Sequence, residues 1–231
     1  MARNGYRVFH GETDAWGTVE NNAKILLRRV DEILAETGAV KVNIIAHSRG
    51  GLEARYLISS LGQSGRIASL TTISTPHHGV KAMNIVLVLP VPLYRFFSYF
   101  VDFWYKILGD KNPDFFHSSR QLSEKVCREF NVANPDRDCV YYQSYASKLK
   151  YYFSDIMYII MNPFLLLTDG ENDGLCPVES AKWGIFRGVI TTRIFGISHS
   201  GIIDAYRIKY REVDIPEFYL SILEDLASKG F

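Results

Sequence analysis

KVNIIAHSRGGLEARY, residues 41–56, places a serine between an apolar run and a segment with helical periodicity. Ala46 and Gly50 lie two positions before and two positions after Ser48. This spacing is typical of a tight strand-to-helix turn that points the hydroxyl outward, and in which a side chain at either flanking position would collide with the backbone. The turn leaves the amide of Arg49 free at a helix N-terminus, where it can stabilise an oxyanion. We therefore expect Ser48 to be a nucleophile and Arg49 to supply one amide donor.

Strand and helix patterns alternate around this turn. Apolar positions repeat at three- and four-residue steps from Val19, and Gly38 supplies a left-handed stop after Thr37. A helix ending at Gly62 follows the serine, and residues 67–74, IASLTTIS, have the pattern of the next buried strand. This alternation predicts an α/β fold with a mostly parallel sheet and helices on both faces.

Shorter patterns predict the remaining elements. Tyr6–Phe9 is a short apolar strand candidate. After a long interruption, Val140–Tyr145 reads as the next strand and Val189–Phe195 as the last one, and Glu217–Ala227 as a closing helix.

Composition limits the class of protein. The chain has 231 residues, of which 47% are apolar, so it can bury one core and we expect a single domain over residues 1–231. The 26 basic and 25 acidic residues give a net charge of +1, which favours no nucleic-acid partner. The three cysteines have no CxxC spacing and indicate neither a disulfide framework nor a zinc site, although a Cys127–Cys139 bridge stays open as an alternative.

A serine nucleophile of this kind is followed along the chain by an acid and then by a histidine. Asp173 lies in a loop between apolar segments, with Gly174 permitting a tight turn after it, and His199 follows the last predicted strand. His199 would take the proton of Ser48, and Asp173 would orient the imidazole. Asp169 and Glu171 are the nearest rivals for the acid.

Four segments taken in order resemble the bacterial triacylglycerol lipases and esterases of the α/β-hydrolase fold. They are KVNIIAHSRGGLEARY, IASLTTISTPHHG, NDGLCPVESAKWG and ISHSGIID. The resemblance implies carboxylic ester hydrolysis through an acyl-enzyme on Ser48, with lipid or simpler esters as substrates. It also implies that residues 80–130 form a lid insertion, and the aromatic run YRFFSYFVDFWYKI suits transient contact with an acyl chain or a lipid interface. Permanent packing of these aromatics in the core is the alternative.

The apolar region Met83–Leu108 is interrupted by prolines and charges, so we expect no membrane span. Calcium-binding members of the resembled family carry an aspartate two residues after the histidine, where this chain has Gly201. Asp204 lies further along the chain than that position. Serine chemistry needs no cofactor, and we expect none.

The family's second oxyanion donor comes from a loop after a strand two strands before the serine turn, often as His-Gly. A strand-helix-strand unit takes about 30 residues, so only one unit fits between Phe9 and Val42. We therefore interpret His10-Gly11 as a polar turn and expect the N-terminal strands and the true oxyanion loop upstream of Met1. This predicts weak activity for the chain, and leaves a non-catalytic fragment or binding module, or an acyltransferase, as alternatives. The start lacks a signal-peptide core, which indicates the cytoplasm for the chain as written and export if an upstream start carries one.

Overall fold

The computed structural model describes residues 5–107 and 109–231, and its centre is a parallel sheet in which the strands follow chain order, β1-β2-β3-β4. Neighbouring strands pair in parallel, with Ala46 opposite Thr72 and Thr72 opposite Ser144. The strands are β1 (Val42–His47), β2 (Ile67–Ile73), β3 (Tyr141–Ser147) and β4 (Ile185–Ile190). Parallel strands need crossover connections, and helices supply them.

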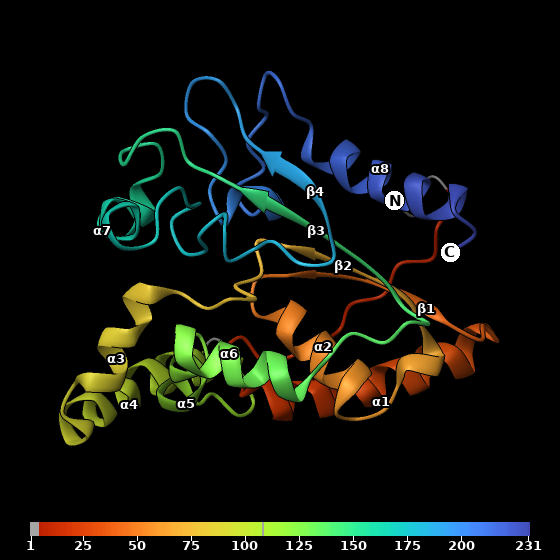
Figure 1. Cartoon of the computed structure of the whole chain (residues 1–231), viewed down its shortest axis with the longest axis horizontal. Coiled ribbons are helices and arrows are strands. Elements are labelled where there is room, and N and C mark those ends of the chain that lie inside the picture. Colours follow the sequence, from red (N-terminus) through yellow and green to blue (C-terminus); the bar gives the residue numbers. More distant parts are fainter. Residues whose placement is uncertain (1–4, 108) are drawn as a thin grey trace.

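Helices cover both faces of the sheet (Figure 1). The helices α1 and α2 lie on one face and α8 lies on the other, while α3, α4 and α7 lie toward the end at which the strands terminate. The α-helices are α1 (Val19–Thr37), α2 (Gly50–Ser59), α3 (Asn84–Val88), α4 (Val91–Ile107), α5 (Phe115–Arg120), α6 (Glu124–Ala133), α7 (Met161–Thr168) and α8 (Ile215–Ser228). Single 3-10 turns are η2 (Ser64–Arg66), η3 (Lys81–Met83), η4 (Ile156–Tyr158) and η5 (Gly201–Ile203). The predicted α/β class is confirmed.

Local chemistry sets the ends of α1. The Thr18 side chain accepts a hydrogen bond from the Asn21 amide at the N-cap, and Gly38 takes a left-handed conformation with φ of 70° at the C-cap. The Gly38 amide donates to the Leu34 carbonyl. These are the caps that the sequence predicts for this helix.

Two apolar clusters lie on the two faces of the sheet. On the α1–α2 face, Ala23 and Val30 pack with Leu57 and Ile58. On the α8 face, Ile222 and Leu226 pack with two isoleucines of the loop after β4, Ile197 and Ile202. The second cluster therefore joins the last helix to the loop that carries His199.

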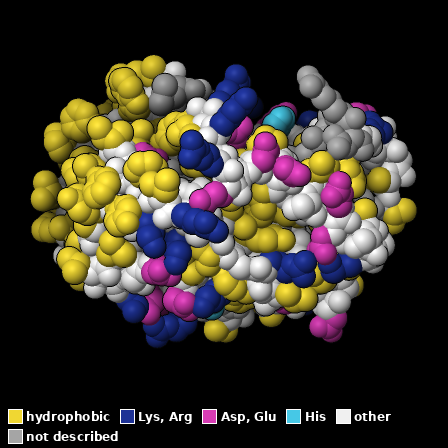
Figure 2. Space-filling view, turned by 90° about the horizontal axis from the view of Figure 1, so that it is seen from above, with side chains coloured by type: hydrophobic (Ala, Val, Ile, Leu, Met, Phe, Trp, Pro, Cys, Tyr) yellow, Lys and Arg dark blue, Asp and Glu magenta, His cyan; other side chains and the backbone are white. Residues whose placement is uncertain are grey.

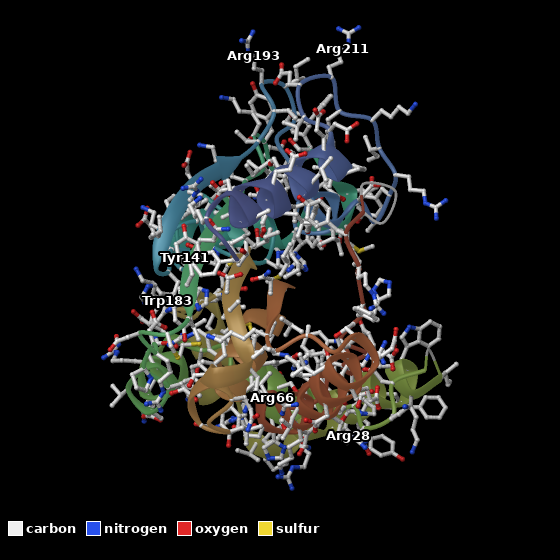
Figure 3. The ribbon with its side chains drawn as sticks, turned by 90° about the vertical axis from the view of Figure 1, so that its right-hand side faces the viewer. Arg28, Arg66, Tyr141, Trp183, Arg193 and Arg211 are labelled. Carbon is white, nitrogen blue, oxygen red and sulfur yellow. The ribbon has the colours of Figure 1, made fainter. Side chains whose placement is uncertain are left out.

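A buried cation lies beneath the sheet on the α2 face. The Arg55 side chain is 1% exposed, and its guanidinium carbon lies 3.6 Å from the centroid of the Trp183 ring. Figure 3 shows Arg193 and Arg211 on loops at the opposite side of the molecule from Arg28 and Arg66.

One predicted strand, Tyr6–Phe9, is absent, and the last predicted strand is displaced along the chain. Residues 6–14 have no regular secondary structure, because the segment lies along α1, where Arg7 pairs with Glu36 at 2.8 Å. The last strand is Ile185–Ile190 and not Val189–Phe195. It ends at Ile190 because Ile190 lies opposite Ser147, the last residue of β3.

Candidate active site

Ser48 lies in a strained turn between β1 and α2. Its φ is +54°, in the left-handed region that residues other than glycine rarely adopt. The Ser48 amide donates to the Ile73 carbonyl at 2.9 Å, and the Ser48 carbonyl accepts from the Gly51 amide at 3.1 Å. Both bonds fix the turn that exposes the hydroxyl at the carboxyl end of β1.

Close packing at this turn falls on Gly51 and not on Gly50, contrary to the expectation from the sequence. A Cβ atom added at Gly50 would lie 3.8 Å from the Ala46 Cβ, which is an ordinary contact. At Gly51 it would lie 2.4 Å from the Thr75 Oγ1 and 2.9 Å from the Thr72 Cγ2. The helix α2 therefore approaches the end of β2 at Gly51.

His199 joins Ser48 and Asp173 in a chain of hydrogen bonds. The Nε2 atom of His199 lies 2.9 Å from the Ser48 Oγ, and its Nδ1 atom lies 2.9 Å from the Asp173 Oδ2. The His199 amide also donates to the Asp173 carbonyl at 2.9 Å. Residues that are 151 positions apart in the chain are thus within hydrogen-bonding distance, in the order that the sequence predicts.

The Asp173 carboxylate is completely buried. Its Oδ1 atom accepts from the amides of Leu175 and Cys176 at 3.1 and 2.8 Å, and its Oδ2 atom accepts from the Ser147 hydroxyl at 3.0 Å. Burial raises the pKa of Asp173, but the charge and hydrogen bond of His199, together with the hydrogen bond from the Cys176 amide, outweigh burial and hold the pKa below its ordinary value. The carboxylate is therefore ionised beside the imidazole.

The two rival acids have other partners. Asp169 accepts from the amides of Lys81 and Ala82 at 2.7 and 3.2 Å, so it caps η3. Glu171 pairs with Lys148 at 2.6 Å on the surface. Only Asp173, among these three acids, contacts His199 in the described residues.

Two serines that contact each other behind Asp173 were not predicted from the sequence as part of the site. Ser147 ends β3, and its hydroxyl lies 2.9 Å from that of Ser74, which directly follows β2. Both side chains are buried. The carboxyl ends of parallel strands meet at one edge of the sheet, so the position of Ser147 at the end of its strand could have indicated this contact. The sequence pattern, however, predicted that this strand ends at Tyr145.

A second histidine lies beside the hydrogen-bonded chain. The His47 ring is 4.4 Å from the His199 ring, centroid to centroid. Burial and the neighbouring His199 charge lower the pKa of His47 to about 3. His47 is therefore neutral at ordinary pH and adds no charge beside His199.

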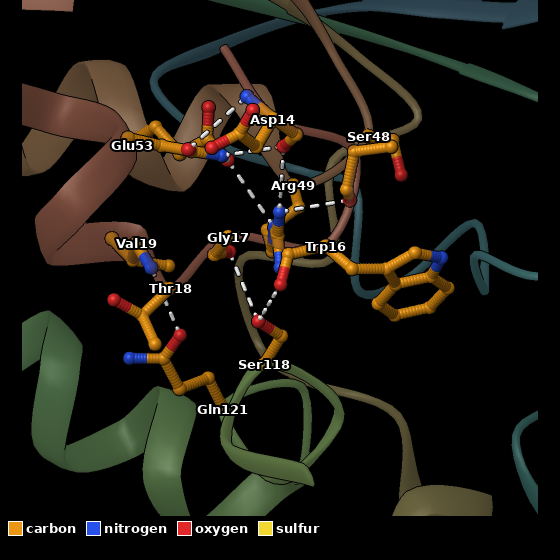
Figure 4. A network of polar contacts seen from close by, with 12 residues as sticks. Asp14, Trp16, Gly17, Thr18, Val19, Ser48, Arg49, Glu53, Ser118 and Gln121 are labelled. Carbon is orange, nitrogen blue, oxygen red and sulfur yellow. Dashed lines mark hydrogen bonds and ion pairs between the residues drawn. The ribbon is translucent and has the colours of Figure 1, made fainter. Parts of the chain in front are cut away.

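The Arg49 side chain forms a buried network that the sequence did not reveal (Figure 4). Its Nε atom lies 3.2 Å from the Glu53 carboxylate, and its Nη2 atom donates to the Ala15 carbonyl at 3.0 Å. Asn22 donates to the same Glu53 oxygen at 2.7 Å. The Arg49 amide donates no hydrogen bond to any residue that the structure describes, which leaves it available next to Ser48.

The loop held by Arg49 also contacts α5 and the segment between α4 and α5. Asp110 accepts from the amides of Ala15 and Trp16 at 2.9 and 3.0 Å, and the Trp16 carbonyl accepts from the Ser118 hydroxyl at 2.8 Å. Residues 14–17 therefore lie between the serine turn and the helices of region 80–130. His10, by contrast, directs its carbonyl to Arg29 of α1 at 3.0 Å.

An acidic side chain at Gly201, as in the calcium-binding members of the resembled family, would have to displace the Tyr210 hydroxyl. A Cβ atom there would lie 2.4 Å from the Tyr210 hydroxyl oxygen. Within residues 5–107 and 109–231, no group of three or more histidine, cysteine, aspartate or glutamate side chains could hold a metal ion. These residues therefore do not fit the calcium site of the resembled family.

Apolar side chains are exposed on two sides of this end of the molecule. On α4, Tyr94 and Ser98 are the buried residues, whereas Phe96, Phe100 and Trp104 are each more than half exposed. On the α7 side, Ile156, Met157, Ile160 and Leu167 are exposed, and Figure 2 shows hydrophobic side chains gathered at the end where α7 lies. No helix within the described residues is long and apolar enough to cross a membrane.

The chain is similar to known lipases and to a thioesterase family. The palmitoyl protein thioesterase family model matches residues 9–182. Triacylglycerol lipase 2 of Saccharomyces cerevisiae is 31% identical over 251 residues, which cover 98% of this chain and 71% of the yeast protein. A triacylglycerol lipase of Pseudarthrobacter phenanthrenivorans is 49% identical over 61 residues, 26% of this chain and 18% of its own length.

Solved structures show the same fold at low sequence identity. Staphylococcus hyicus lipase superposes with a TM-score of 0.70 at 17% identity, covering 97% of this chain and 86% of that one. Lipase 1 from Pelosinus fermentans gives 0.66 at 15%, covering 97% and 89%. By the family match and the identity to the yeast protein, the chain belongs to the triacylglycerol lipase-like α/β-hydrolases, a family of carboxylic ester hydrolases.

Proposed function

We propose that the chain hydrolyses acyl esters of lipids, triacylglycerols among them, through an acyl-enzyme on Ser48. The observation that carries the proposal is the chain of hydrogen bonds from Ser48 Oγ to His199 to Asp173, with 2.9 Å at each step. In this geometry His199 accepts the Ser48 proton while Oγ attacks the acyl carbonyl carbon, and returns the proton to the leaving alcohol. A water molecule, deprotonated by His199, then attacks the acyl carbon, the bond to Oγ breaks, and His199 returns the proton to Ser48 as the acid leaves.

Asp173 and Arg49 have supporting roles in the proposed reaction. Asp173 keeps His199 Nδ1 protonated and stabilises the imidazolium, because its carboxylate is ionised and accepts from that atom. The free amide of Arg49 lies next to the nucleophile at the start of α2, where a backbone donor stabilises the oxyanion.

The lipid class of substrate rests on the relatives and on the surface. The yeast and Pseudarthrobacter relatives are named as triacylglycerol lipases. The exposed aromatic face of α4 is poorly suited to water and well suited to acyl chains. Residues 80–130 act as the lid in this proposal, and α4 is the part of the lid that contacts a lipid interface for a short time.

Replacement of the nucleophile tests the reaction. Ser48→Ala should lower hydrolysis of p-nitrophenyl butyrate by a factor on the order of 10⁴ or more. Ser221→Ala, which changes an exposed serine on α8, is the matched control and should retain wild-type activity. Wild-type activity of Ser48→Ala would refute the proposal.

A fluorophosphonate probe separates the catalytic proposal from a binding module of the same fold. The wild-type chain should label at one serine, and Ser48→Ala should not label. A folded wild-type chain that neither labels nor hydrolyses any ester would support the binding module. Product analysis with a competing alcohol separates hydrolysis from acyl transfer, since a transferase yields a new ester.

Thioester hydrolysis is a second candidate, because the palmitoyl protein thioesterase model matches residues 9–182. The same serine chemistry cleaves a thioester, with a thiol as the leaving group. Comparison of kcat/KM on an oxygen ester and a thioester with the same acyl chain decides between them.

The lid assignment has its own test. Phe100→Ser with Trp104→Ser removes two exposed aromatics from α4 and should lower activity on emulsified long-chain esters about tenfold or more, while activity on soluble butyrate esters stays within about twofold. Val40→Ser, an exposed apolar change between α1 and β1, should alter neither activity. Equal loss on both substrates would refute the lipid-contact role.

A further inference from the structure

One buried side chain contacts both loops that carry the proposed partners of Ser48. Tyr158 is the last residue of η4 and is 4% exposed. Its hydroxyl is hydrogen-bonded to the Ser200 hydroxyl, one residue after His199. Its ring lies against Gly174, one residue after Asp173, so closely that a Cβ atom at Gly174 would lie 2.4 Å from the Tyr158 Cγ.

Gly174 has the conformation that this contact requires. Its φ is +104°, and its amide donates to the side chain of Asn172 at 2.8 Å. The same Asn172 oxygen accepts from Asn162 of α7 at 2.9 Å. The segment that contains η4 and α7 therefore contacts the acid loop, the loop around Asp173, at two points, through the Tyr158 ring and the side-chain amide of Asn162.

The contact of Tyr158 with Ser200 adds the histidine loop to this support. The main chains of the two loops meet where the His199 amide donates to the Asp173 carbonyl. Tyr158 lies across this junction, with its ring on the acid loop and its hydroxyl on the histidine loop. Burial raises the pKa of Tyr158 to about 12, so the hydroxyl stays protonated as a hydrogen-bonding group at working pH.

We propose that Tyr158 is a positioning residue that holds the His199 loop against the Asp173 loop, and thereby keeps His199 Nε2 within hydrogen-bonding distance of Ser48. The proposal rests on the proposed function of these three residues. It assigns to Tyr158 no contact with substrate. Loss of its hydroxyl should therefore lower kcat and leave KM nearly unchanged, because a small displacement of a catalytic base lowers the rate of the chemical step.

The test removes, in turn, each partner of the hydrogen bond between the Tyr158 and Ser200 hydroxyls. Tyr158→Phe removes the hydroxyl and retains the ring against Gly174, and Ser200→Ala removes the partner. Each variant should lower kcat on p-nitrophenyl butyrate about 10- to 100-fold, with KM within about twofold. The double variant should be no slower than the slower single variant, because both changes break the same bond.

Two controls separate positioning from general stability. Tyr152→Phe removes the hydroxyl of a tyrosine that is 54% exposed in the same segment and should retain wild-type kcat. Ser200→Thr keeps a hydroxyl and should recover most of the kcat that Ser200→Ala loses. Circular dichroism melts then show whether Tyr158→Phe is folded, and Ser200→Ala carries the test if it is not.

Wild-type kcat in both single variants, or multiplication of their effects in the double variant, would overturn the positioning role while leaving the proposed function intact. Failure of the proposed function is distinct, since the wild-type chain would then neither label with fluorophosphonate nor hydrolyse esters. In that case the positioning role falls with it.

Discussion

The guanidinium of Arg49 and the carboxylate of Glu53 form an ion pair of 3.2 Å directly behind Ser48, with only 8% and 4% of their side-chain surfaces exposed. Removal of one partner from such a pair leaves an uncompensated buried charge. Glu53→Ala should therefore lower the free energy of unfolding by about 3–5 kcal/mol in urea denaturation.

Two controls accompany this prediction. The double variant Arg49→Met, Glu53→Leu should cost less than Glu53→Ala alone, because it removes both charges. Glu179→Ala breaks an exposed pair with Lys182 and should change stability by less than about 1 kcal/mol. A double variant that is less stable than Glu53→Ala would contradict this account of the pair.

Gly50 and Gly51 form a matched pair for testing the packing of the serine turn. Gly51→Ala should lower the free energy of unfolding by about 1–3 kcal/mol, because the new methyl group meets the buried Thr75 and Thr72 side chains. Gly50→Ala meets only an ordinary contact with Ala46 and should stay within about 1 kcal/mol of wild type. Equal stability of the two variants in urea would show that α2 moves away from β2 at no cost.

His77 makes stability depend on pH. The ring is completely buried, and burial with the neighbouring Arg55 charge lowers the pKa of His77 well below 6.5. Below pH 6.5 the unfolded chain therefore binds a proton that the folded chain does not bind, so stability falls as pH falls, by up to about 1.4 kcal/mol per pH unit for this residue.

The measurement is the free energy of unfolding in urea at pH 7, 6 and 5. His77→Gln should reduce the slope against pH by up to about 1.4 kcal/mol per unit, reached below pH 6, whatever its effect at pH 7. The same slope in the variant and in the wild type would assign the acid sensitivity to other groups, among which His47 is the first candidate because its pKa is also lowered.

The three cysteines should differ in reactivity. All three are free, which makes the Cys127–Cys139 bridge left open by the sequence incorrect for this structure. Cys127 and Cys176 are buried, and burial raises the pKa of Cys127 to about 12. Ellman's reagent should therefore titrate one thiol, Cys139, in the native chain and three in denaturant. Loss of the native reaction in Cys139→Ser identifies the site.

The serine turn and the order of the three polar residues could be predicted because their signals are local. Ser48 stands in a strand-turn-helix pattern, and Asp173 and His199 each follow an apolar run in the order that the fold requires. The sequence also predicts that hydrogen bonds join these three residues, but it does not give the distances between their atoms.

The parts that could not be predicted depend on pairing between distant residues. The end of β4 is set by Ser147 of β3, and the contact of Asp14 with the Lys111 amide joins positions 97 residues apart. Tyr158 gives no sequence signal, because it is one of several apolar residues in the segment between β3 and α7 and only burial distinguishes it. The contacts of the Arg49 side chain and the close packing at Gly51 likewise depend on tertiary structure.

The packing of Ile197 and Ile202 beneath Ile222 and Leu226 has a consequence for biosynthesis. Synthesis proceeds from the N-terminus, so Ser48 leaves the ribosome well before the histidine loop and α8. The histidine loop gains its contacts with Ile222 and Leu226 only after α8 has been synthesised. We therefore expect the hydrogen-bonded chain from Ser48 to Asp173 to be completed at the end of synthesis.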